Sequence, residues 1–399
     1  MTTAAVATQS PRTTILLLAI AQALYSCCII TVFSTAGLVG LMIAPSKAWA
    51  TLPITTFVVG SMATTIPASF LMRRFGRKPV FMLGALVSIL GAGLATWSIF
   101  HSAFVAFCIA TAMQGVFQAT SNYYRFAAVE ASDPANKSIA ISWVLTGGVV
   151  AAIAGTLIAS ATADYFAPFT FAGSYAAAIL LALANVAVVT LMHLPKPQAE
   201  EVAGPQRSWG ELLQQPRLVA AMASAIVAYA LMNLMMTAAP VAMAMCGFQQ
   251  TDSKWVIQWH VLGMFVPSFF TGLLIKRFGV NLITGLGMAL LIAAGIAGLA
   301  GITFTHFAVG LILLGIGWNF GFIGGTTMLT DCYRPSERAK VQAVNDFGIS
   351  AMMAVASASS GVMLSHWGWQ SVPLVLFPLA LAMIALIVWQ VMRSRVSGT

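Results

Sequence analysis

The sequence predicts an all-α integral membrane protein with twelve transmembrane helices. Of its 399 residues, 59% are hydrophobic and only 7% are charged, with a mean hydropathy of +0.90. A water-soluble domain normally carries about 25% charged residues, so this chain cannot cover itself with polar surface. In addition, apolar stretches of about 20 residues, the length that crosses the hydrocarbon of a bilayer, recur along the whole chain.

Taken in order, the apolar stretches fall into two sets of six. In the first half we expect helices over 14–35, 50–72, 79–99, 103–124, 138–160 and 169–193. In the second half we expect them over 217–240, 253–275, 280–300, 306–330, 342–365 and 370–392. The first stretch lacks a clear small-residue cleavage site before polar sequence, so we interpret it as a helix and not as a removed signal peptide.

A polar stretch divides the chain near its middle. Leu194 to Gln215 is the longest such stretch, and it contains three prolines and three glutamates. We therefore predict an N-terminal six-helix bundle over 1–193, a cytoplasmic linker over 194–216 and a C-terminal six-helix bundle over 217–399.

The distribution of basic residues predicts the orientation. If the N-terminus is cytoplasmic, only Lys47 and Lys254 of the 19 Lys and Arg residues lie in outside loops. This positive-inside bias places both termini in the cytoplasm. It also accounts for the net charge of +9, because basic residues at many inside helix ends are anchors beside anionic membrane lipid. Nucleic acid is therefore excluded as a partner.

A short basic motif recurs in the two halves. Ser69-Phe-Leu-Met-Arg-Arg-Phe-Gly76 follows the second apolar stretch, and Gly272-Leu-Leu-Ile-Lys-Arg-Phe-Gly279 follows the eighth. The first copy resembles the loop Gly-x-x-x-Asp-Arg-x-Gly-Arg-Arg/Lys of the major facilitator superfamily. The matching residues are Arg74, Gly76, Arg77 and Lys78, whereas Ser69 replaces the usual Gly and Arg73 the usual Asp.

This resemblance implies two six-helix bundles that rock about a central site in alternating access. Arg73 and Arg74 would then be gating residues, and Arg73 would need another acidic partner, Glu130 or Asp133. Plain anchoring of the topology is the alternative interpretation of these arginines. In the second half, the glycines of the tenth stretch, such as Gly315 and Gly325, are expected to line close helix contacts.

Ionisable residues inside a membrane are costly and are candidates for function. Arg125, at the end of the fourth stretch, could act in gating or substrate binding, with Glu130 near enough in sequence to neutralise it. Asp346, near the inner end of the eleventh stretch, is either an interfacial helix-end carboxylate or a proton-coupling site.

Two pairs of residues spaced four apart suggest a metal site. Met232 and Met236 lie in the seventh stretch, and His260 and Met264 lie in the eighth. At 1.5 Å per residue, Met236 and His260 fall about 7 to 10 Å from the outer ends of their helices, and the other two about 13 to 16 Å. Thioether and imidazole ligands suit Cu(I). The alternative is that the methionines are adaptable core filler.

These pairs resemble the paired motifs of the CcoA-type bacterial copper importers within the superfamily. The resemblance implies a monomeric inner-membrane protein that imports copper for haem-copper oxidase assembly, has no prosthetic group and exchanges copper with chaperones. Cys246 and Cys332 would be ligands where the ion enters and leaves, or simply buried or interfacial thiols. The five cysteines contain no CxxC, which argues against a zinc site or a disulfide framework.

Two other functions remain open from the sequence. One is a permease for an organic solute such as riboflavin or a drug, for which Trp143, Trp259 and Trp318 could stack on a planar ring. The other is an oxidase assembly scaffold that does not transport. The sequence has no nucleophile elbow, HExxH motif or P-loop, so we predict that the protein is not an enzyme.

Overall fold

The computed structural model describes residues 10–46, 49–194 and 204–396, and the regular structure in these ranges is helical throughout. Twelve of its helical spans, from Pro11–Ile43 to Ser371–Arg393, are long and apolar enough to cross a membrane. The twelve stretches predicted from the sequence are thereby confirmed, and the protein is a multi-pass membrane protein. Lys47, which was assigned to an outside loop, lies outside the described residues.

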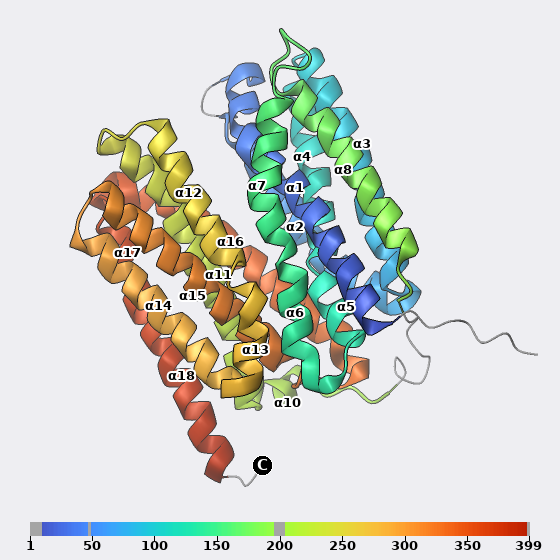
Figure 1. Cartoon of the computed structure of the whole chain (residues 1–399), viewed down its shortest axis with the longest axis vertical. Helices are drawn as coiled ribbons and strands as arrows, with labels where there is room; N and C mark the ends of the chain where they lie inside the picture. Colours follow the sequence, from blue (N-terminus) through green and yellow to red (C-terminus); the bar gives the residue numbers. More distant parts are fainter. Residues whose placement is uncertain (1–9, 47–48, 195–203, 397–399) are drawn as a thin grey trace, which may run out of the picture. The chain divides into compact units, whose positions relative to one another are not determined.

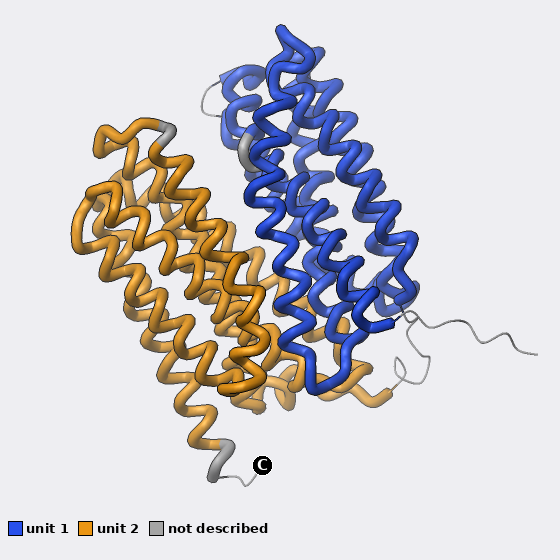
Figure 2. Tube along the Cα trace, viewed as in Figure 1, with its two compact units in different colours: residues 1–202 blue, residues 203–399 orange. Residues whose placement is uncertain are grey.

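The chain forms two compact units, residues 1–202 and 203–399 (Figure 2). The helices of unit 1 are α1 (Pro11–Ile43), α2 (Leu52–Phe75), α3 (Arg77–Phe100), α4 (Phe104–Ser121), α5 (Tyr124–Glu130), α6 (Lys137–Leu145), α7 (Gly147–Ala161) and α8 (Ala172–Leu191). A short 3-10 helix, η2 (Pro134–Asn136), precedes α6. The boundaries 1–193, 194–216 and 217–399 stay a prediction, since 195–203 lie outside the described residues.

Unit 2 contains the remaining helices. They are α10 (Trp209–Leu213), α11 (Pro216–Met245), α12 (Gln250–Phe265), α13 (Ser268–Phe278), α14 (Val280–Ala300), α15 (Phe304–Leu329), α16 (Arg338–Trp367), α17 (Ser371–Leu374) and α18 (Leu376–Val396), with the 3-10 helix η3 (Pro335–Glu337) before α16. The stretch predicted as a linker therefore includes a helix, α10, that belongs to unit 2.

Each unit is built around a few long helices (Figure 1). In unit 1, α1 packs on α6, α7 and α8, while α4 packs on α2 and α3. In unit 2, α15 packs on α11, α12 and α14, and α11 packs also on α16. Within unit 2, α15 is thus the central helix, and its buried residues extend over almost its whole length.

The basic motif recurs as the same backbone turn in both units. Gly76 joins α2 to α3 with φ 87° and ψ 169°, and Gly279 joins α13 to α14 with φ 87° and ψ 149°. This region of backbone space is open essentially to glycine alone. The repeat seen in the sequence is therefore explained by a repeated conformation, in which one residue reverses the chain between two membrane spans.

Glycines let α15 approach its neighbours closely. A Cβ atom added to Gly315 would lie 2.5 Å from the carbonyl oxygen of His260 in α12. One added to Gly325 would lie 2.9 Å from the carbonyl oxygen of Ala221 in α11. The expectation that the glycines of this helix line helix contacts is confirmed, and substitution by alanine would push the helices apart.

Candidate functional site

Four aromatic rings from three helices meet in unit 2. Trp318 and Phe322 of α15 stack with ring centroids 5.2 Å apart and an interplanar angle of 14°. Tyr229 of α11 stands edge-on to both, at 5.1 Å and 4.9 Å, and Phe265 of α12 stands edge-on to Trp318 at 5.7 Å. Edge-on and offset-stacked pairs are the favourable arrangements of aromatic rings. We call Tyr229, Phe265, Trp318 and Phe322 the aromatic cluster.

The polar atom of the aromatic cluster is unusual. Trp318 is only 1% exposed, and its indole Nε1 has no hydrogen-bond partner among the described residues. A buried indole N–H normally finds an acceptor, and an exception calls for an explanation. Trp369, by comparison, is also buried but donates from Nε1 to the carbonyl oxygen of Gly298 at 2.8 Å. Trp318 therefore holds a desolvated donor inside an apolar cluster.

Next to the aromatic cluster, Asn319, the residue that follows Trp318, forms a polar clamp that ties α15 to the joint between α12 and α13. Asn319 donates from Nδ2 to the Met264 carbonyl oxygen and to the Ser268 hydroxyl, both at 2.6 Å. Its amide oxygen accepts from the Thr271 hydroxyl at 2.6 Å. The joint lies at Pro267, which has no N–H to continue the helical ladder. The clamp positions Phe265 against Trp318, and both the amide oxygen and the amide nitrogen of Asn319 have hydrogen-bond partners.

The residues proposed as copper ligands all lie in unit 2. His260 is fully buried, and its Nδ1 lies 2.7 Å from the Leu311 carbonyl oxygen of α15. Met232 and Met264 are buried as well, at 4% and 8% exposure, and Met236 is half-buried. The helices that carry them, α11 and α12, both pack on α15. The placements of the three methionines fit the alternative that they are adaptable core filler.

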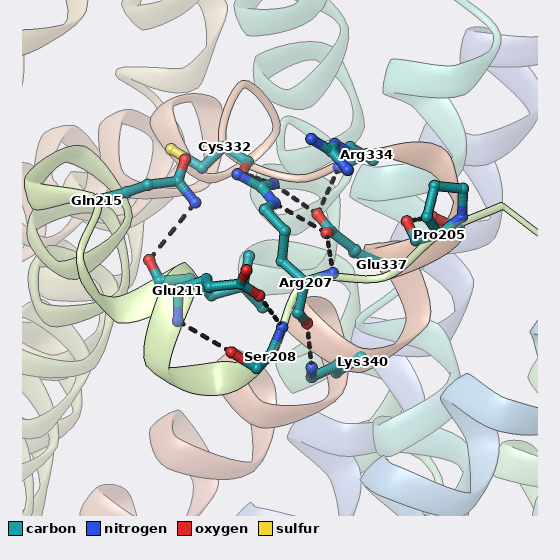
Figure 3. Close-up of polar contacts among 11 residues, drawn as sticks. Pro205, Arg207, Ser208, Glu211, Gln215, Cys332, Arg334, Glu337 and Lys340 are labelled. Atoms are coloured by element: carbon teal, nitrogen blue, oxygen red, sulfur yellow. Dashed lines mark hydrogen bonds and ion pairs between the residues drawn. The ribbon is translucent and has the colours of Figure 1, made fainter.

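The charges at one end of unit 2 form a buried network (Figure 3). Arg207 binds Glu337 through Nε to Oε1 at 2.8 Å and Nη2 to Oε2 at 2.6 Å, and its backbone N–H donates to Oε1 at 2.8 Å. The Glu337 side chain is 0% exposed. Hydrogen bonds to Glu337 raise the pKa of the Arg207 guanidinium, and a bidentate pair of this kind is among the stronger charge interactions.

The same network fixes the segment before α11. Ser336 donates to the Pro205 carbonyl oxygen at 3.1 Å, and Lys340 donates to the Arg207 carbonyl oxygen at 2.8 Å. Ser208 and Glu211 form a capping box at the start of α10, and these hydrogen bonds lower the pKa of the Glu211 carboxyl. We call residues 204–215 the strap, because these contacts hold it on η3 and α16.

Unit 1 has a different ion pair. Arg77, the first residue of α3, binds Glu130 at the end of α5 with Nε to Oε2 at 2.7 Å and a second contact from Nη2 to Oε1. Its guanidinium also lies over the Tyr123 ring at 6.0 Å. Glu130, which the sequence offered as a partner of Arg73, is thus a partner of Arg77. Arg73 is half-buried and Arg74 is exposed, with its guanidinium over the Phe75 ring at 5.2 Å.

Two further charges predicted to be functional are buried. Arg125 is 5% exposed, donates from Nη1 to the Asn122 carbonyl oxygen at 2.8 Å and lies over the Phe126 ring at 4.5 Å. Asp346 is 2% exposed and accepts from the Asn345 amide at 2.8 Å. Their burial fits a role in gating or coupling, which stays a prediction.

The two cysteines proposed to lie along an ion pathway differ in environment. Cys246, which follows α11, is exposed. Cys332 is 5% exposed, and its thiol donates to the Met328 carbonyl oxygen at 3.2 Å. Burial raises the pKa of the Cys332 thiol to about 11, which makes it a poor ligand and nucleophile at neutral pH.

Sequence reasoning missed the aromatic cluster as a unit and the Arg207–Glu337 pair. The spacing of Trp318 and Phe322, four residues apart, places both on one helix face, and this signal was available. The ion pair had no such signal, because its partners lie 130 residues apart in the chain.

Comparison with known proteins identifies the class. The profile of the Major Facilitator Superfamily matches residues 18–250 and 221–397, and the chain belongs to this family of transporters. It is therefore a transporter and not an enzyme.

Individual proteins of the family are similar to this chain over most of their length. The chain is 43% identical over 381 residues to the riboflavin transporter RfnT of Brucella anthropi, covering 94% of this chain and 95% of that one. It is 28% identical over 387 residues to the uncharacterised transporter YdeG of Bacillus subtilis, covering 90% and 89%. Among solved structures, the human organic anion transporter MFSD10 is similar in fold, with a TM-score of 0.74 at 12% identity over 95% of this chain and 100% of that one.

The relatives correct the prediction of copper import. The relative that matches 94% of this chain at 43% identity is a riboflavin transporter and not a CcoA-type copper importer. Copper as cargo, copper chaperones as partners and a role in oxidase assembly lose their support with it. The physical reason is that a Met-x-x-x-Met spacing is expected about once by chance among 21 methionines in an apolar chain. Such a pattern cannot separate ligands from core filler.

Proposed function

We propose that this protein is a permease for riboflavin or a closely similar flat heteroaromatic solute, working by alternating access. The observation that carries the proposal is the 43% identity over nearly the whole chain to a riboflavin transporter. Such identity, spread over 381 residues, involves the membrane spans themselves, which are the parts of a transporter that contact its cargo.

The aromatic cluster supports the same cargo. A flavin offers a flat ring system that can stack on aromatic side chains, together with carbonyl oxygens and ring nitrogens that accept hydrogen bonds. Tyr229 and Phe265 keep part of their surface exposed, so they can contact a ring. Trp318 supplies an N–H donor that is already shielded from water in the protein without its cargo, so binding incurs no further cost of removing water from it. Binding of an acceptor there would satisfy it and would select polar flat rings over purely apolar ones.

A riboflavin auxotroph that expresses the protein tests the proposal. Growth on low external riboflavin is expected to depend on the transporter. Trp318→Phe keeps an aromatic ring in the stack but removes the N–H together with part of the indole ring system, so we expect the KM for riboflavin uptake to rise at least about fivefold, the value of one hydrogen bond of about 1 kcal/mol. Protein stability should fall only by the cost of the cavity that the smaller ring leaves, because that N–H has no partner to lose.

Trp369→Phe is the matched control. It also removes one buried indole N–H, but this N–H bonds the Gly298 carbonyl oxygen. We expect it to lose about 1 to 2 kcal/mol more stability than Trp318→Phe, because both variants leave the same cavity but only this one breaks a hydrogen bond, and we expect an unchanged KM. If Trp318→Phe transports riboflavin with the wild-type KM, the aromatic cluster has no part in binding.

We also propose that the protein is a monomer in a bacterial cytoplasmic membrane with both termini inside. The positive-inside bias supports this orientation. The exposed Cys246 would then face the periplasm, and an impermeant maleimide added to whole cells should label wild type but not Cys246→Ser. Buried Cys332, with its pKa raised to about 11, should remain unlabelled. Labelling only after the membrane is opened would contradict the orientation.

Asp346 is the carboxylate that we propose for proton coupling, on the ground of its burial in α16. Asp346→Asn should lose uptake against a gradient and keep exchange of internal for external riboflavin. Loss of both activities would show that Asp346 acts elsewhere in the cycle.

A further inference from the structure

A groove opens between three segments of unit 2. It is lined by Leu213 at the end of α10, Gln214, Pro216 and Val219 at the start of α11, and Trp389 and Arg393 near the end of α18. Its volume is about 390 Å³, which is within the range of small-molecule sites. We call it the α10–α18 groove. It lies at the end of the unit where the basic residues gather.

One wall of the groove is held in place by contacts outside it. One side is the end of the strap, which is held in place by the Arg207–Glu337 pair and by the capping box of Ser208. Lys340 lies over the Trp209 ring at 4.9 Å and adds a further contact to α10. Leu212 is buried beneath the helix, whereas Leu213, the next residue, is 53% exposed and faces the groove. The apolar wall is therefore held by contacts outside the groove.

The other side of the groove carries a cation on an aromatic ring. The Arg393 guanidinium lies over the Trp389 ring, 5.4 Å from its centroid. An arginine fork binds phosphate oxygens with paired hydrogen bonds, and stacking on an indole orients the fork. Glu211 lies two residues before Leu213 in the chain. Its carboxylate accepts a hydrogen bond from the Ser208 backbone N–H at 2.5 Å within the capping box.

These features match one kind of occupant. Tryptophan and arginine at a helix end are the side chains that meet lipid headgroups at the membrane interface, and juxtamembrane basic groups attract anionic lipid. Leu213, Pro216 and Val219 offer an apolar surface next to the cation, as the junction of a headgroup with its acyl chains requires. A soluble phosphate compound has no acyl chain that would contact this apolar surface.

We propose that the α10–α18 groove binds an anionic phospholipid, with the phosphate on Arg393 and the upper acyl chains on Leu213 and Val219. The site is separate from the aromatic cluster and does not depend on the cargo. It couples lipid to the strap, because the residues that form one wall of the groove belong to the same segment that Arg207 ties to Glu337.

The chain offers a matched control for Arg393. Arg277, at the end of α13, also lies over a ring, that of Phe278, at 5.1 Å, and it is exposed. It has the same charge and the same stacking, but it does not line the groove. General attraction of anionic lipid would be weakened equally by Arg277→Gln and Arg393→Gln.

Native mass spectrometry of the purified, delipidated full-length protein tests the site, with phosphatidylglycerol and phosphatidylcholine of identical acyl chains as probes. Wild type should retain one phosphatidylglycerol in preference to phosphatidylcholine. Arg393→Gln should weaken that binding about fivefold, the effect expected for one interfacial basic residue, and Arg277→Gln should change it less than twofold. Leu213→Trp, which keeps every charge but fills the groove, should weaken it as well.

Three results would overturn the proposal. They are equal effects of the two arginine variants, equal retention of the two lipids, and unchanged binding in Leu213→Trp. A fourth such result would be competition by millimolar inorganic phosphate, which has no acyl chains and would assign the groove to a soluble anion. Thermal unfolding of each variant in detergent confirms that a loss of binding is not a loss of fold.

Discussion

At the end of α2 in unit 1 and of α13 in unit 2 the backbone makes the same glycine turn, but different residues follow it. Arg77 follows Gly76 and pairs with Glu130, whereas Val280 follows Gly279. Glu130 lies four residues before Pro134, and Asp331 lies four residues before Pro335, so the two acids are equivalent by spacing.

The equivalent acids therefore have different partners. With valine at the position of Arg77, Asp331 binds Arg217 at the start of α11 at 2.8 Å, and the side chains of Arg217 and Asp331 are 44% and 37% exposed. The pair in unit 1 is far more buried, at 8% and 16%. In unit 2 the buried pair is formed instead by Glu337 and Arg207 of the strap. The comparison teaches that the repeat preserves the backbone turn, while each unit satisfies its charges separately.

The largest effect should come from breaking the buried pair of unit 2. Glu337→Gln leaves Arg207 without its counter-charge among groups that are largely desolvated, and we expect a loss of about 3 kcal/mol in the free energy of unfolding. Reversible unfolding in mixed detergent micelles measures it. Glu130→Gln should cost about as much in unit 1, since its pair is similarly buried. A loss below about 1 kcal/mol would show that the strap is not held by this pair.

The glycine turn of unit 2 should give an intermediate effect. Gly279→Ala places a side chain at φ 87° and ψ 149°, which costs about 1 to 3 kcal/mol in backbone strain. No atom lies within 4 Å of the added Cβ, so the cost is conformational and not steric. Gly285→Ala, in the middle of α14 and equally free of contacts, is the control and should be neutral or stabilising. A neutral Gly279→Ala would contradict the account of the repeat.

The smallest effect should come from the exposed pair. Asp331→Asn removes an ion pair that water screens, and such pairs contribute about 0 to 1 kcal/mol. Unfolding measured as for Glu337→Gln, at low and at high salt, provides the comparison. A loss as large as that of Glu130→Gln would mean that the two equivalent acids have equivalent roles after all.

The fold was predictable from the sequence to a large extent, and the site was not. Apolar length and the Gly76 and Gly279 repeat suffice for twelve spans, because bilayer thickness and backbone geometry are local constraints. The partners of charged and aromatic residues depend on packing between distant segments. The sequence offered Glu130 or Asp133 as a partner of Arg73, and only the structure shows that Glu130 binds Arg77, 53 residues away in the chain.

The error over cargo has the same origin. His260 with Met264 gives a soft-metal pattern at the correct helical spacing, but spacing cannot tell whether a side chain faces a pathway or a neighbouring helix. In the structure His260 faces α15 and bonds its backbone. The aromatic cluster, by contrast, needs rings from three helices, and a single helix reveals only the Trp318 and Phe322 half of it.

The most direct test of the proposed transport is uptake by the purified protein in liposomes, with radiolabelled riboflavin and radioactive copper supplied in parallel. We predict saturable riboflavin uptake that excess unlabelled riboflavin abolishes and that Trp318→Phe weakens, with copper uptake no greater than in empty liposomes. Protein-dependent copper uptake without riboflavin uptake would contradict the account.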